Sequence, residues 1–184
     1  MSLENSPELE SRDLKSLFTV GHSNCEFAPF INLLENSRVE LLVDVRSRPH
    51  SSRFPQFSQP GFEALLAAEK ISYLFLGEEL GGRPDDADAY RSDGLVDYRA
   101  RRKSYAFRAG LERLVMELEK KSTAIMCAER VYFQCHRMLV SDYLTAHGHK
   151  VLHIDSAKPT REHTLMKEAW VNDGRLLYIG DRLF

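Results

Sequence analysis

The stretch that decides the fold reads VELLVDV and covers residues 39–45. It is almost continuously apolar, as expected for a strand that helices cover on both faces. Residues 26–36 precede it with apolar side chains at helical spacing, and residues 17–20 form an earlier apolar run. A strand, a helix and a second strand in this order predict parallel strands joined by a right-handed crossover.

The same alternation continues towards the C-terminus. We expect helices at residues 62–70, 99–121 and 135–147 and strands at residues 71–76, 123–127 and 150–154. The pattern predicts an α/β fold, a three-layer sandwich with a mostly parallel sheet of about five strands and helices on both faces. Residues 163–170 indicate a short helical piece, and Asp173-Gly174 predicts a turn into a small edge strand at residues 175–179.

Length and composition indicate a single domain. With 184 residues, of which 43% are hydrophobic, the chain can bury one core. Residues 1–14 are polar without an apolar period, so we expect a flexible N-terminal tail and a single α/β domain over residues 15–184. No apolar run approaches the roughly 20 residues of a membrane helix, and the N-terminus lacks the apolar core of a signal peptide. We therefore expect a cytoplasmic protein without a membrane partner.

Charge and cysteine content narrow the function classes. The formal net charge is −2, so any nucleic-acid binding depends on a local basic patch rather than on overall attraction. Three cysteines without a secretion signal indicate reduced thiols rather than a disulfide framework. These features assign neither a cofactor nor an oligomeric state.

Polar side chains follow the predicted strands. In open parallel sheets, ligands bind outside the carboxyl ends of the strands. His22 and Ser23 follow the first strand, and Asp44, Arg46 and Arg48 end or follow the second. Strand ends also meet solvent, which by itself accounts for part of this pattern.

The segment after the fourth strand is richer in reactive groups, because residues 127–137 read CAERVYFQCHR. A strand, a loop and a helix start point free backbone N–H groups at the loop, which attracts anions and lowers thiol pKa values. The predicted catalytic residues are Cys127, Cys135, His22, Glu129 and His136. The predicted substrate-binding residues are Ser23, Asp44, Arg46, Arg48, Arg130 and Arg137. In the alternative interpretation, the two cysteines are packing residues and Arg137 forms a surface salt bridge.

The same segment could also hold a metal ion or form a redox switch. Cys127 and Cys135 have seven residues between them, whereas structural zinc sites typically separate paired cysteines by about two to four. Cys135 and His136 are adjacent at a helix start, so we assign no metal ligand. A disulfide between Cys127 and Cys135 is geometrically conceivable.

Two basic segments favour a different partner. Residues 46–57 mix guanidinium groups, an imidazole and aromatic rings, a mixture that holds phosphates and stacks bases. Residues 98–108 add further arginines, and the two segments together predict a basic wall beside the strand ends. We expect its surface to expose Arg48, Arg53, Arg101 and Arg102. The alternative is a solvated helix face and a loop whose aromatic rings cover the sheet.

Several ordered motifs are shared with a known family. They are TVGHS at residues 19–23, LVDVRSRP at 42–49, RFPQF at 53–57, LGG at 80–82, CAE through CHR at 127–137 and EHTL at 162–165. In these motifs the chain resembles the domain-of-unknown-function family 488. The resemblance implies an α/β fold and implies no particular activity. Cys25 and the aspartate-rich segment at residues 85–93 depart from it.

These observations lead first to an enzyme that acts on an anionic small molecule or nucleotide. A cysteine thiolate of residues 127–137 is the expected nucleophile, a histidine its acid–base partner, and arginines the anion clamps. One alternative is a nucleic-acid-binding or processing module that uses the basic aromatic loop. The other is a metal or redox regulatory domain.

Overall fold

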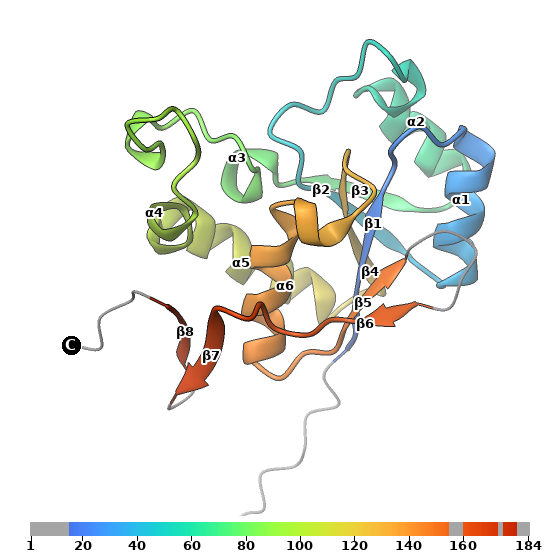
Figure 1. Ribbon diagram of the computed structural model, residues 1–184. Coiled ribbons are helices and arrows are strands. Elements are labelled where there is room, and N and C mark those ends of the chain that lie inside the picture. Colours follow the sequence, from blue (N-terminus) through green and yellow to red (C-terminus); the bar gives the residue numbers. More distant parts are fainter. Residues whose placement is uncertain (1–14, 155–159, 173–174, 180–184) are drawn as a thin grey trace, which may run out of the picture.

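A computed structural model describes residues 15–154, 160–172 and 175–179. The tail expected at residues 1–14 and the turn at residues 173–174 lie outside these ranges. The described residues form a six-stranded, mostly parallel sheet with helices on both faces (Figure 1), which confirms the predicted α/β sandwich.

The strand order places one late strand in the middle of the sheet. Five strands are parallel: β1 (Leu17–Gly21), β2 (Leu41–Asp44), β3 (Ser72–Phe75), β4 (Thr123–Cys127) and β5 (Val151–Ile154). β6 (Arg161–Glu162) adds an antiparallel edge to β5. The order is β3-β2-β4-β1-β5-β6, so β4 is inserted between β1 and β2. Ligand crevices of open sheets lie where the strand order reverses in this way.

Two helix layers bury the two faces of the sheet. α1 (Phe27–Asn36) and α2 (Gly61–Ala68) cover one face, and α5 (Tyr105–Leu118) and α6 (Arg137–Ala146) cover the other (Figure 1). Successive strand residues alternate between the layers, so that Leu42 packs with the first pair and Val43 with the second. This double burial explains the continuous apolar run in β2. Among the described residues, none of the helices combines the length and the apolar character that a membrane span requires.

The long helix predicted at residues 99–121 is two helices. α4 (Tyr98–Lys103) ends before Ser104, whose extended backbone (φ −66°, ψ 148°) and side chain cap the start of α5. The Ser104 hydroxyl accepts a hydrogen bond from the Phe107 amide, as helix-capping serines do. The polar connection between β3 and α4 contains a short helix, α3 (Gly77–Leu80), and a 3-10 turn, η2 (Ala87–Ala89).

The helical piece predicted at residues 163–170 is wrong. The His163 amide donates to the Val151 carbonyl, and the Met166 amide donates to the Asp142 carboxylate, so this segment stays extended along β5 and α6. It leads into β7 (Ala169–Asn172), which pairs with β8 (Arg175–Tyr178) in a separate antiparallel sheet. The small strand predicted at residues 175–179 is thus present as β8, in this separate sheet.

A buried hydrogen-bonded chain connects this C-terminal segment to β1. The Thr19 hydroxyl lies 2.7 Å from His153 Nδ1, and His153 Nε2 lies 2.9 Å from His163 Nδ1. His163 Nε2 lies 2.8 Å from Asp142 Oδ1. A carboxylate only accepts, so every group is satisfied when each one donates towards Asp142. Burial, followed by His163, Arg137 and Arg161, lowers the pKa of His153 from 6.5 to about 3.

The lowered pKa of His153 predicts that the protein loses stability as the pH falls. Between pH 6.5 and about 3 the unfolded chain binds a proton at His153 that the folded chain excludes, so the free energy of unfolding decreases as the pH falls through this window. His153→Gln should reduce by nearly one the difference in bound protons between the unfolded and the folded chain in this window, and so flatten the pH dependence of the free energy of unfolding. The measurement is urea denaturation at several pH values between 7 and 4.

Leu144→Ala is the matched control, because it removes a buried apolar side chain of α6 and keeps the histidine. It should lower stability equally at each pH. Identical pH dependence in the wild-type protein and in His153→Gln would contradict the prediction.

Candidate functional site

A cleft of about 560 Å³ lies at the carboxyl ends of β1, β2 and β4. The segment after β4 continues to pair with the segment after β1, because the amides of His22 and Ser23 donate to the carbonyls of Cys127 and Ala128. The central position of β4 therefore brings its reactive loop between the ends of the other two strands. Seven predicted site residues line the cleft: His22, Arg46, Arg48, Cys127, Glu129, Cys135 and His136.

Four of these residues form a compact cluster. One ligand atom from each of Cys127, Glu129, Cys135 and His136 lies within 4.8 Å of the others. Glu129 Oε2 is 2.6 Å from Cys127 Sγ and 3.5 Å from Cys135 Sγ. His136 Nδ1 is 3.8 Å and 3.6 Å from the same two sulfur atoms. The cysteines are buried, whereas Glu129 is exposed in the cleft.

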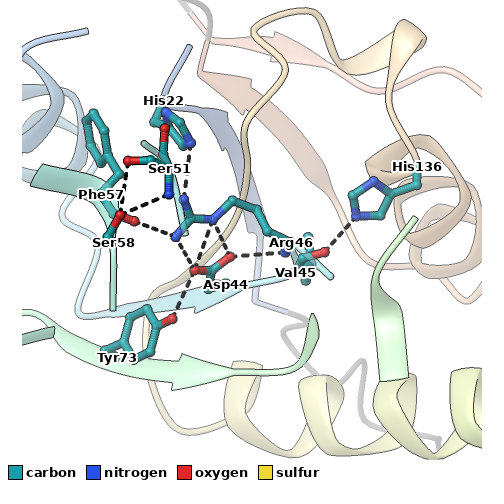
Figure 2. Close-up of polar contacts among 9 residues, drawn as sticks. All are labelled: His22, Asp44, Val45, Arg46, Ser51, Phe57, Ser58, Tyr73 and His136. Atoms are coloured by element: carbon teal, nitrogen blue, oxygen red, sulfur yellow. Dashed lines mark hydrogen bonds and ion pairs between the residues drawn. The ribbon is translucent and has the colours of Figure 1, made fainter. Parts of the chain in front are cut away.

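The His136 ring is held from both sides. Its Nε2 lies 2.8 Å from the Val45 carbonyl (Figure 2), so Nε2 carries a hydrogen that it donates to this carbonyl, and Nδ1 faces the sulfur atoms. Gly82 packs against the ring, where an added Cβ would lie 2.7 Å from Nδ1. The glycine therefore leaves the room that this ring orientation requires.

Arg137 supports the cluster from beneath and is not the surface salt bridge of the alternative interpretation, because only 1% of it is exposed. Its Nε donates to Cys135 Sγ at 3.3 Å, and its Nη2 donates to the Glu129 carbonyl at 2.5 Å. A further N–H group reaches the Thr19 hydroxyl at 3.5 Å. The buried guanidinium thus ties the loop after β4 to the start of α6.

The pKa values of the two cysteine thiols are shifted in opposite directions. Interaction with the Cys127 thiol lowers the pKa of Cys135 well below its ordinary value, and His136 and Arg137 act in the same direction. The same interaction, together with burial, raises the pKa of Cys127. Cys135, next to the Arg137 guanidinium, is therefore the more acidic of the two thiols.

Arg46 organises the opposite wall of the cleft (Figure 2). Its guanidinium binds both carboxylate oxygens of Asp44, donates to the Phe57 carbonyl at 2.8 Å and lies 3.3 Å from His22 Nε2. The Tyr73 hydroxyl also donates to Asp44, at 2.9 Å. Burial, followed by Arg46, lowers the pKa of His22 to about 4. Every nitrogen of the Arg46 guanidinium group is engaged within the protein, so the group acts as a support.

Several predicted site residues do not line the cleft: Ser23, Asp44, Arg130 and Arg137. Sequence reasoning also missed lining residues, namely Ser47, His50, Ser51, Gly82, Arg83, Asp85, Tyr90, Tyr98, Ala128 and Gln134. The double glycine at residues 81–82 was the available sequence signal for the side of the cleft that Gly82 and Arg83 form. Its meaning depends on His136, which approaches from a distant segment.

The predicted basic wall is interrupted by buried side chains. Phe57 is fully buried and stacks on His22 with ring centroids 4.4 Å apart. The prediction that Arg101 is exposed is wrong, because it is 4% exposed and donates to the carbonyls of Glu78 and Glu79. Part of the basic aromatic loop, residues 46–57, is therefore buried in the core.

Comparison with known proteins identifies one family. The model of the domain of unknown function DUF488 matches residues 26–144, which include β2, β4 and the reactive cluster. No match was found among curated proteins or among solved structures.

The contact between Gly82 and His136 predicts a selective loss of stability. Gly82→Ala should displace the ring or its Val45 hydrogen bond and lower the free energy of unfolding by about 1–3 kcal/mol, the usual cost of overpacking. The measurement is urea denaturation at pH 7.

Gly61→Ala provides the matched control, since nothing lies within 4 Å of an added Cβ there. Gly61 begins α2, where alanine is the better helix former, so this change should be neutral or stabilising. Equal effects of the two substitutions would contradict the role given to Gly82.

Proposed function

The chain belongs to the family defined by the domain of unknown function DUF488, and we propose that it is an enzyme acting on an anionic small molecule or nucleotide. The ligand would bind in the cleft, and the reactive cluster of Cys127, Glu129, Cys135 and His136 would act on it. The observation that carries this proposal is the shared location of the cluster and of two exposed arginines, Arg48 and Arg83, in one cleft.

Arg48 and Arg83 are suited to bind the anion. Both side chains are exposed in the cleft, and among the residues that the structure describes no hydrogen bond or ion pair occupies either guanidinium group. The Arg83 amide donates to the Ser47 hydroxyl at 2.8 Å, which joins the backbone segments that carry the two arginines. Guanidinium groups bind carboxylates and phosphates through paired hydrogen bonds.

The remaining lining residues favour a nucleotide within this class. Tyr90 and Tyr98 are 36% and 44% exposed and present aromatic rings on which a base can stack. Asp85 and Glu129 place carboxylates in the same cleft, where they can accept hydrogen bonds from hydroxyl or amino groups. A nucleotide offers an anion, a ring and such donors together.

A nucleic-acid surface receives less support. It would need the basic aromatic loop and residues 98–108 of α4 and α5 to present their side chains outward, but Arg46, Phe57 and Arg101 are buried. The exposed Arg48 and Arg83 line a cleft of about 560 Å³. This geometry fits a small anion better than a strand.

The proposal predicts that Arg48→Ala and Arg83→Ala each weaken ligand binding. Losing one hydrogen bond between a cation and an anion costs about 1.5–3 kcal/mol, or roughly tenfold to a hundredfold in affinity. The probes are inorganic phosphate and adenosine monophosphate, titrated by calorimetry at low salt. Arg113→Ala, an exposed change on α5 outside the cleft, should leave binding unchanged.

Two results would count against the proposal. Absence of binding of both probes to the folded wild-type protein would remove the anion site, as would equal affinities in all three variants. The enzymatic part is tested by incubating a panel of nucleotides with the protein and analysing the products by mass spectrometry. If the protein binds nucleotides but converts none of them, it is a binding module rather than an enzyme.

A further inference from the structure

We propose that Cys127, Cys135 and His136 bind a zinc ion in the cleft, with Glu129 as the fourth ligand on the open side. The sequence spacing of Cys127 and Cys135 argued against a zinc site, but that argument applies only to paired cysteines held within one tight turn. Here a strand end, a short 3-10 turn, η3 (Tyr132–Gln134), and the start of α6 bring the ligands together. A catalytic role for the ion rests on the proposed function, whereas its binding does not.

The separations between the ligand atoms suit a tetrahedral ion. Bonds of 2.0–2.3 Å place neighbouring ligand atoms about 3.3–3.8 Å apart. His136 Nδ1 lies 3.6 Å and 3.8 Å from the sulfur atoms, and Glu129 Oε2 lies 3.5 Å from Cys135 Sγ. The 2.6 Å between Glu129 and Cys127 is shorter. The exposed carboxylate has room to move outward by about 1 Å to complete the tetrahedron.

The surroundings of the ligands are those of a metal site. Histidines that bind metals donate their second ring N–H group to a carbonyl or carboxylate, as His136 does to Val45. The Arg137 side chain and amide both donate to Cys135 Sγ, at 3.3 Å and 3.5 Å. Two thiolates and one carboxylate carry three negative charges against the two positive charges of the ion. The Arg137 guanidinium offsets the remaining one.

The ligand types select zinc over the common hard cations. Magnesium and calcium prefer sites made entirely of oxygen, whereas thiolate and imidazole suit zinc. Two buried cysteines and one histidine leave a position that faces the cleft, where Glu129 is exposed. Catalytic zinc sites keep three protein ligands and one such exchangeable position. An anionic oxygen of the ligand held by Arg48 and Arg83 would replace Glu129 there.

The first experiment uses the reduced, metal-free, full-length wild-type protein. Titration with cobalt(II), which replaces zinc and is coloured, should saturate at one ion per chain. It should also produce the near-ultraviolet absorption of thiolate bound to cobalt, and zinc should abolish the signal. Bound zinc should slow alkylation of Cys127 and Cys135 at least about tenfold, because a coordinated sulfur is a poor nucleophile. The third free cysteine, Cys25, is only partly buried and lies outside the cluster, so its alkylation rate should not change.

Variants then identify the ligands. Cys135→Ser and His136→Gln should weaken zinc binding by at least about 10–100-fold. Glu129→Gln should have a smaller effect, and Cys25→Ser should have none. If circular dichroism shows that a cysteine variant does not fold, the cobalt spectrum and the alkylation rates of the wild-type protein decide alone.

Three results would overturn the zinc site. They are a cobalt titration without thiolate absorption, alkylation rates that zinc does not change, and a Cys127–Cys135 disulfide in protein purified without oxygen. A protein that binds zinc but neither phosphate nor adenosine monophosphate would keep the site and refute the proposed function. A protein that binds these anions through Arg48 and Arg83 but does not bind zinc would refute the zinc site and keep the proposed anion site.

Discussion

Arg46 carries a positive charge into a position that is only 5% exposed, and the fully buried Asp44 neutralises it. Breaking such a pair by removing one partner is costly, because it leaves an unpaired buried charge. The guanidinium also holds the Phe57 carbonyl and the His22 ring, so one side chain fixes the segments after β1 and β2. Val45 stands between the two paired residues, and its carbonyl orients His136. The wall and the reactive cluster therefore share one support.

The sequence predicted the parallel sheet well because its signals are local. The apolar runs of β2 and β4 reflect burial on both faces, and their residues can be recognised without knowing which strands lie beside them. The insertion of β4 between β1 and β2 depends on pairings between distant segments, which no local pattern encodes. Ser104 shows a different failure: a single capping serine inside a helical period divides one predicted helix into two.

The chemistry of the site was predicted by residue type better than by role. Arg46 and Arg137 were expected to bind an anion, yet both are buried and bind protein carbonyls, while Arg83 lines the cleft without having been selected. An arginine becomes a support or a ligand-binding group according to the partners that other segments bring to it. Spacing likewise concealed how closely Cys127 and Cys135 approach.

The buried chain that begins at Thr19 and ends at Asp142 has one direction, since its last member only accepts hydrogen bonds and Arg137, at its other end, only donates them. Its two histidines therefore have interlocked tautomers, and neither can be exchanged for an apolar residue without stranding a neighbour's polar atom. Most of the cost falls on the first replacement, and a second one nearby adds little. The members of the chain thus contribute to stability as one coupled unit rather than as separate pairs.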